Sequence, residues 1–277
     1  MKFTKLILAL LISIFIFTPV FPLQASEKEQ VSVLTYSSSD NDTVILSISR
    51  RGLKFEIGSD ADRILFLYNA DTSPSVLYLA QPGAGMAFKL TRPELQRVAA
   101  QLNTRYRTME ENMDQMLREI PRDERDNFRQ TMPDFSQISI DTPPQIKFIK
   151  DKDVRWNNRA ARRGHFEVNK QKRGQGILLD EPPLSIPEAR QRTLQGFQKI
   201  LNGWTEILRR QATTNQQNPY RETRNLLGDY HLRLAEFEEH SEKIKLVDWK
   251  TSRVKKDFFK LPEEINVQSV EAALVAP

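Results

Sequence analysis

The sequence contains no cysteine and only three histidines among its 277 residues. A chain without cysteine forms no disulfide, no iron–sulfur centre and no thiol nucleophile, and it offers zinc no thiolate ligand. The histidines, His165, His231 and His240, do not follow the H-E-x-x-H spacing of a zinc protease. We therefore predict no metal site, no cofactor and no catalytic residue.

A large excess of one charge is also missing. Lys+Arg 41 against Asp+Glu 36 leaves a formal net charge of +5, and 39% of the residues are hydrophobic. So small an excess does not predict nucleic-acid binding, and the hydrophobic fraction excludes wholesale disorder. The S-x-x-K match at residues 252–255 lies at the wrong end of the chain for a penicillin-recognising serine enzyme, so we interpret it as chance.

The first 25 residues have the pattern of a secretory signal peptide. Lys2 and Lys5 precede an apolar run over residues 6–17, and two prolines follow it ahead of Ala25. The run is about a dozen residues, fewer than the roughly 20 that span a bilayer, so a retained membrane anchor is the weaker interpretation. We expect cleavage after Ala25 and a periplasmic or secreted bacterial protein, without a lipid anchor because no cysteine is there to receive one.

After a polar lead-in over residues 26–42, the hydrophobic pattern is typical of short strands. Residues 43–49 are mostly β-branched or apolar, and Leu53, Phe55 and Ile57 alternate with charged residues. Further strands are expected at 63–69, 75–80 and 85–90, with turn residues between them. This pattern predicts an antiparallel meander.

The period of the pattern changes at Thr91, where Thr91 and Glu94 have the spacing of a capping box. Apolar residues then recur every three or four positions, which predicts a helix of nearly 30 residues. We expect this helix to bury one face against the sheet through Leu95, Leu102, Met109 and Met113.

A second capping box at residues 185–188 predicts a second amphipathic helix, which carries Leu194 and Leu201. Strands are expected between the helices at 137–140, 145–150, 154–157, 165–168 and 176–180. A closing hairpin is expected to pair a strand at 230–238 with one at 244–254.

The order of these elements predicts the α+β class. We expect a curved antiparallel sheet, an unclosed half-barrel, with the two long amphipathic helices covering its concave face. One domain would span residues 43–262, and residues 263–277 would form a flexible tail.

The chain resembles small periplasmic proteins whose fold is like that of the lipoprotein-localisation factors. The likeness covers residues 43–262 in the order of elements, including the basic and alternating segment 50–57 and the ending Phe259-Lys-Leu-Pro262. Some relatives carry a cysteine in the middle strand pair, where residues 160–166 stand here without one. The resemblance implies a half-barrel with helices over its open face and a cavity that holds acyl chains.

Large aromatic residues suggest what the concave face does. We expect an apolar ligand, a lipid or the acyl chain of a lipoprotein, to be bound there, because a cavity between sheet and helices is lined by such residues. The candidate ligand-binding residues are Phe55, Phe66, Tyr68, Tyr78, Phe88, Phe197 and Trp204. The alternative is that these side chains fill the space as a core. In that case the protein would be a structural or protein-interaction module of the cell envelope, with no ligand cavity.

The densest basic cluster consists of Arg155, Arg159, Arg162 and Arg163, with Trp156 among them. One interpretation is an electrostatic patch that binds an anionic membrane surface or an acidic protein. The other is a solvated hairpin whose charges protect an edge strand from pairing.

Overall fold

The computed structural model describes residues 28–39, 42–58, 63–121, 124–125, 137–142, 145–211, 230, 232–239 and 242–271. The predicted signal peptide, His231 and His240 lie outside the described residues. Among the helices of this part of the chain, none is both long enough and apolar enough to cross a membrane.

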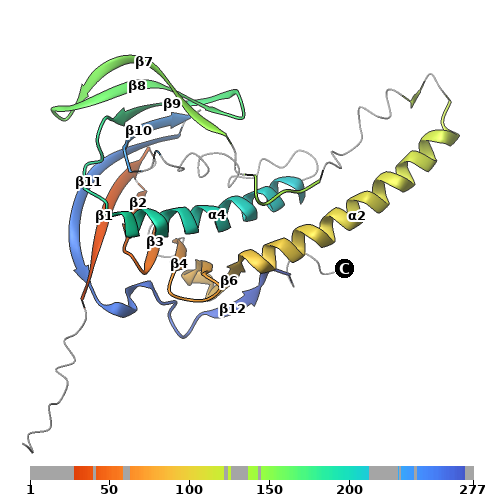
Figure 1. Ribbon diagram of the computed structural model, residues 1–277, viewed down its shortest axis with the longest axis horizontal. Helices are drawn as coiled ribbons and strands as arrows, with labels where there is room; N and C mark the ends of the chain where they lie inside the picture. Colours follow the sequence, from red (N-terminus) through yellow and green to blue (C-terminus); the bar gives the residue numbers. More distant parts are fainter. Residues whose placement is uncertain are drawn as a thin grey trace, which may run out of the picture.

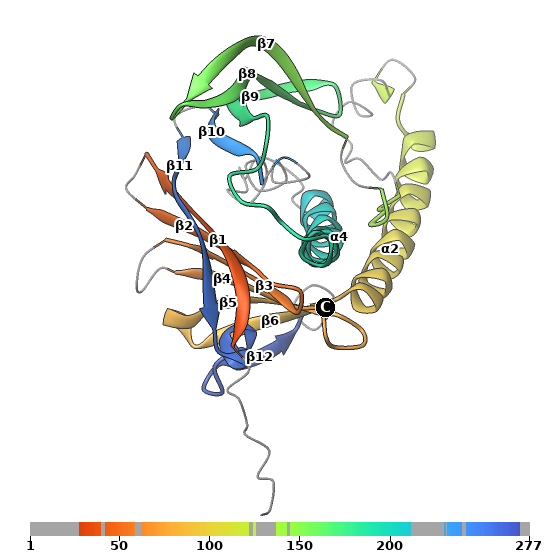
Figure 2. The same cartoon turned by 60° about the vertical axis from the view of Figure 1, so that its left-hand side comes forward.

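One sheet of twelve strands forms most of the molecule, in the order β12-β6-β5-β4-β3-β2-β1-β11-β10-β9-β8-β7. Figures 1 and 2 show it as a strongly curved, open sheet with the helix α4 inside the curve and α2 beside α4. The strands are β1 (Glu29–Ser38), β2 (Thr43–Ile48), β3 (Gly52–Ile57), β4 (Ile64–Asn69), β5 (Val76–Gln81), β6 (Met86–Thr91), β7 (Ile146–Trp156), β8 (Arg159–Val168), β9 (Gln171–Leu179), β10 (Leu234–Glu239), β11 (Glu242–Val254) and β12 (Asn266–Ser269). This arrangement confirms the α+β class and an open sheet.

The predicted meander is present as β2 to β6, because each strand alternates between two faces. Leu53 and Phe55 of β3 are buried in the main core. Lys54 and Glu56, which alternate with them, form an ion pair at 3.2 Å on the other face. Each neighbouring pair from β2 to β6 is antiparallel and in continuous register.

Two strands lie in segments that the sequence predicted to be irregular. β1 occupies the expected lead-in and pairs with both β2 and β11, which makes it an interior strand of the sheet. β12 occupies the expected flexible tail and pairs with β6 in parallel, so the sheet is mixed rather than purely antiparallel. A hydrogen bond from Ser269 Oγ to Glu94 Oε1, at 2.6 Å, also ties β12 to α2.

The second half of the sheet also differs from the prediction in detail. Residues 137–140 form no strand, and the strand expected from 230 begins only at Leu234. The predicted strands 145–150 and 154–157 are one long strand, β7, with an irregularity between Lys150 and Lys152. It turns into β8 at Asn157 and Asn158, whose φ angles of 46° and 64° are those of a two-residue hairpin.

The first helix, α2, spans Arg92–Glu119, and its Thr91 side chain accepts a hydrogen bond from the Glu94 N–H, as the capping box predicted. The helix buries Leu95, Val98, Ala99 and Leu102 near its beginning, and Leu117 near its end. The predicted burial of Met109 is wrong, because this side chain is 47% exposed. Met113 is only half-buried.

The second helix, α4, spans Glu188–Gln211 and packs against β2, β3, β5 and β6 and against α2. Glycine at 196 permits a close approach to the sheet, because a Cβ there would meet the hydroxyl of Tyr68 on β4. α2 packs against α4 and β6, so the two helices form one joined layer. One apolar cluster runs from the inner faces of β2 to β4 through α4 to β9 and β10.

Candidate functional site

Most of the predicted ligand-binding residues come together in the main core beside α4. Phe55 and Phe66 face each other across β3 and β4, with ring centroids 5.7 Å apart. Phe197 of α4 makes edge contacts with Phe66 at 6.4 Å and with Tyr68 at 6.3 Å. Trp204 belongs to the same buried cluster, and half-buried Phe88 packs against it.

Tyr78 is the exception among these aromatic residues. It lies opposite Leu67 and packs in a second cluster with Leu65, Leu67 and Ala80 on the other face of the sheet. Its neighbours Leu77 and Leu79 face the main core. Because side chains alternate along a strand, Tyr78 does not share a face with the other aromatic residues, and we remove it from the candidate set.

The structure divides the predicted basic patch between two faces of the β7–β8 hairpin. Arg159 lies opposite Trp156, and Arg163 lies four positions further along the same strand. Arg155 and Arg162 alternate with these positions and face the other way. Arg162 is ion-paired with Asp180 at 2.9 Å.

Trp156 is part of the protein interior. Its side chain is buried, its ring lies 6.2 Å from that of Trp249, and its Nε1 donates to Glu236 Oε1 at 3.1 Å. The Arg159 guanidinium lies over the Trp249 ring at 5.1 Å. The tryptophan that suggested a membrane-binding patch therefore belongs to the core, where it packs against Trp249, the ring over which Arg159 lies.

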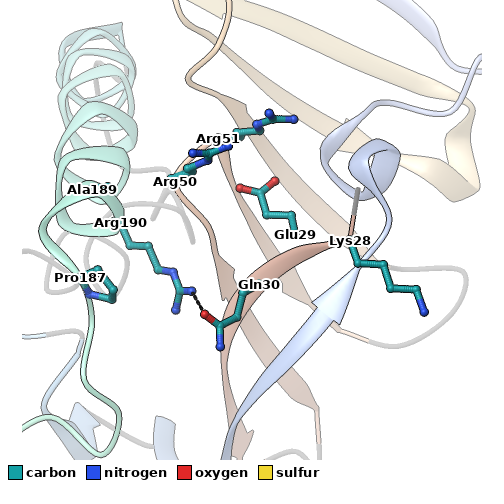
Figure 3. A pocket seen from close by; sticks show the side chains of 8 residues that line it. All are labelled: Lys28, Glu29, Gln30, Arg50, Arg51, Pro187, Ala189 and Arg190. Carbon is teal, nitrogen blue, oxygen red and sulfur yellow. Dashed lines mark hydrogen bonds between the residues drawn. The ribbon is translucent and has the colours of Figure 1, made fainter. Parts of the chain in front are cut away.

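A pocket of about 450 Å³ lies where the beginning of α4 meets the β2–β3 turn and the start of β1 (Figure 3). It is lined by Lys28, Glu29, Gln30, Arg50, Arg51, Pro187, Ala189 and Arg190. A second pocket, of about 490 Å³, shares Arg50, Arg51 and Ala189 with it and extends towards Asp71 and Arg192. We call the first of these the arginine pocket.

The β2–β3 turn holds Arg50 and Arg51 at the rim of the arginine pocket. The Ser49 hydroxyl accepts hydrogen bonds from the backbone N–H groups of Arg51 and Gly52, each at 3.0 Å, and fixes the turn. The Thr193 hydroxyl of α4 donates to the backbone carbonyl of Arg50 at 2.9 Å, which ties the turn to the helix. Arg50 is exposed, and Arg51 is half-buried and ion-paired with Asp71 at 3.5 Å.

Arg190 forms the inner wall of the arginine pocket and is only 8% exposed. Its guanidinium donates to Ser32 Oγ at 2.6 Å and to Gln30 Oε1 at 3.1 Å. Both acceptors are neutral, and within the described part of the chain no carboxylate forms an ion pair with Arg190. The other unusual group is Glu29, because both of its carboxylate oxygens are buried and accept no hydrogen bond from the residues described.

The sequence contains a signal for this pocket that the motif search missed. Arg190 stands four residues before Leu194 and seven before Phe197, so it lies on the apolar stripe of α4. A charged residue on such a stripe is buried with the stripe, and a buried charge needs partners.

Neither a protein-family model nor a curated protein matches the chain. Among the described residues, no group of three or more histidine, cysteine, aspartate or glutamate side chains is placed to hold a metal ion.

Proposed function

We propose that the protein is an exported, non-catalytic carrier that binds an apolar ligand, a lipid or a lipoprotein acyl chain, between its curved sheet and its helices. In this proposal the fold is a half-barrel of the lipoprotein-localisation type, and α2 and α4 together cover its concave face. The ligand takes the place that helix side chains occupy in the unliganded protein.

The observation that carries the proposal is the continuous apolar cluster on the inner face of an open sheet. The cluster joins Phe66 of β4 and Phe197 of α4 with Phe166 of β8 and Phe237 of β10. α4 packs against β2, β3, β5 and β6, and its Phe197 ring contacts Phe66 and Tyr68 of β4, so the helix packs mainly on the half of the sheet formed by β2 to β6. An acyl chain lying along this lining would be in contact with apolar side chains over its whole length.

The packing of these rings requires that the helices move before a ligand can enter. Phe55, Phe66 and Phe197 are each at most 5% exposed, and the Phe66 ring contacts both of the others. A side-chain interior of this density has no free volume for an acyl chain. We therefore propose that α4 and α2 shift away from the sheet, or from each other, when the ligand binds.

Titration of the protein with a fluorescent fatty acid tests the carrier proposal. We expect saturable binding that Phe66→Trp weakens, because the larger ring fills the ligand's place beside Phe197. Tyr78→Trp is the matched control, since Tyr78 lies on the other face of the sheet, and it should bind as the unaltered protein does. Absence of saturable binding by the unaltered protein would contradict the proposal.

A protein-interaction module is the second candidate, and one observation favours it. The distal half of α2 carries Met109, 47% exposed, and Met116, 52% exposed, and methionine side chains adapt readily to a partner surface. This function would be favoured if the unaltered protein is stably folded and yet does not bind the fatty acid.

A further inference from the structure

We propose that the arginine pocket binds a phosphoryl group, carried either by a free phosphate compound or by a phospholipid headgroup. The pocket shares no residue with the aromatic set of the carrier proposal. The two proposals can therefore fail separately.

The first argument is the uncompensated charge of Arg190. A buried guanidinium is costly unless it is paired, and this one has only a hydroxyl and an amide oxygen as acceptors in the described part of the chain. A guanidinium offers five N–H donors in a planar fork. An anion entering the pocket would supply the missing negative charge and could accept from the donors that Ser32 and Gln30 do not use.

The second argument is the excess of basic side chains among the residues that line the pocket. Arg50 and Lys28 line the same pocket, as does Arg51, which is ion-paired with Asp71, and Glu29 is the one carboxylate of the lining. This balance matches a phosphoryl group, which carries up to two negative charges and several acceptor oxygens, better than it matches a single carboxylate. The N-terminal end of α4 adds to the positive potential, because Pro187 and Ala189 also line the pocket.

The third argument concerns access. Arg50 is exposed at the rim and Arg190 is buried at the inner wall, so a ligand can enter from solvent and reach a fixed donor. Figure 3 shows both side chains at the same pocket, with Arg190 coming from α4 and Arg50 from the β2–β3 turn. A volume of about 450 Å³ accommodates a phosphoryl group together with a small substituent.

Glu29 provides a way to determine the sign of the ligand's charge. Its carboxylate lies in the pocket wall without a hydrogen-bond partner among the residues described. A negative charge at this place repels an anion, so Glu29→Gln should strengthen the binding of phosphate. A ligand that used Glu29 to hold an ammonium group would instead be bound more weakly by this variant.

The experiment measures the dissociation constant of inorganic phosphate by calorimetry, with sodium chloride keeping the ionic strength constant. We expect phosphate to bind and to raise the melting temperature. Arg50→Gln should weaken binding about tenfold, the effect of losing one charged hydrogen bond. Arg50 is exposed, so this variant should fold normally. Arg107→Gln, which removes the same charge from an exposed site on α2, should leave binding unchanged.

Vesicles distinguish the two sources of the phosphoryl group. Binding to phosphatidylglycerol vesicles but not to digalactosyl diacylglycerol vesicles, which carry no phosphate, would identify a lipid headgroup. Binding of inorganic phosphate alone would identify a free phosphate compound. The proposal is overturned if neither phosphate nor phosphatidylglycerol binds, if Arg107→Gln weakens binding as much as Arg50→Gln, or if Glu29→Gln weakens it.

Discussion

At the scale of a single residue, Tyr36 makes the stability of the fold depend on pH. The side chain is 3% exposed on β1, and burial raises the pKa of its hydroxyl well above the ordinary value of 10.0. The unfolded chain releases this proton near pH 10 while the folded chain keeps it. The folded state therefore binds more protons there, and its stability falls as the pH rises above about 10.

Substituting Tyr36 tests this coupling. Tyr36→Phe removes the ionisable group, so the free energy of unfolding should fall less between pH 9 and pH 11 than it does in the unaltered protein. Urea unfolding of both proteins at the two pH values measures the difference. Equal losses would show that Tyr36 ionises as easily in the folded state as in the unfolded chain.

Gly196 is the residue that sets the distance between α4 and the sheet. A Cβ there would meet the Tyr68 hydroxyl, and Tyr68 is held by its contact with Phe197. Alanine is the better helix former by about 1 kcal/mol, so a loss of stability in Gly196→Ala would have to come from the clash. We expect a net loss of about 1–3 kcal/mol.

Two comparisons complete the test of Gly196. Gly203→Ala in the same helix should change stability less, because its nearest neighbours would lie 3.3 Å from the new Cβ. Tyr68→Phe should restore part of the stability of Gly196→Ala, since it removes the hydroxyl that clashes. If Gly196→Ala and Gly203→Ala have the same free energy of unfolding, the proposed clash with Tyr68 is contradicted.

At the scale of the element, α2 is packed at its beginning and largely exposed in its middle, before Leu117 is buried near its end. Leu102 is 4% exposed in the main core, whereas Met109, two turns further on, is 47% exposed. Leu102→Ala should therefore cost about 2–5 kcal/mol of unfolding free energy. Met109→Ala should change it by no more than about 0.5 kcal/mol. Equal effects in thermal or urea unfolding would mean that α2 packs along its whole length.

The elements also show what the sequence could predict. β3 follows from the alternation of apolar and charged residues, β4 from a short apolar run, and both helices from the three-to-four spacing of apolar residues after each capping box. β1 was missed because serine and threonine accompany its apolar residues, and Ser32 is as completely buried as Val31. β12 was missed because all four of its residues are exposed, and its pairing with β6 depends on tertiary contacts.

The sequence predicted only part of the candidate sites, because periodicity groups residues of one element but does not show which elements meet. Periodicity brought Phe55, Phe66 and Phe197 to one cluster, but the prediction grouped Tyr78 with them although it lies on the opposite face of its strand. The arginine pocket depends on three segments far apart in the sequence, around Gln30, Arg50 and Arg190. No local pattern shows that these segments meet.

At the scale of the whole molecule, the carrier proposal depends on whether the helices can move. The segment 137–142 lies between them: Asn103 of α2 makes two hydrogen bonds with the backbone of Ile138, at 3.1 and 2.7 Å, and Arg92 pairs with Asp141 at 2.7 Å. On the other side, Gly203 of α4 faces Ile140. A covalent bond between residues 140 and 203 would therefore hold α4 to the segment that is bound to α2.

Fatty-acid binding by the double variant Ile140→Cys/Gly203→Cys tests the central claim most directly. A Cβ on residue 203 would lie 3.3 Å from the Cβ of Ile140, just below the roughly 3.5–4.5 Å of a disulfide, so a small shift allows the bond, and the chain has no other cysteine to interfere. We predict that the reduced protein binds the probe and that oxidation weakens binding at least about tenfold, while the cysteine-free protein binds equally under both conditions. Equal binding by the reduced and the oxidised double variant would contradict the claim that the helices move to admit the ligand.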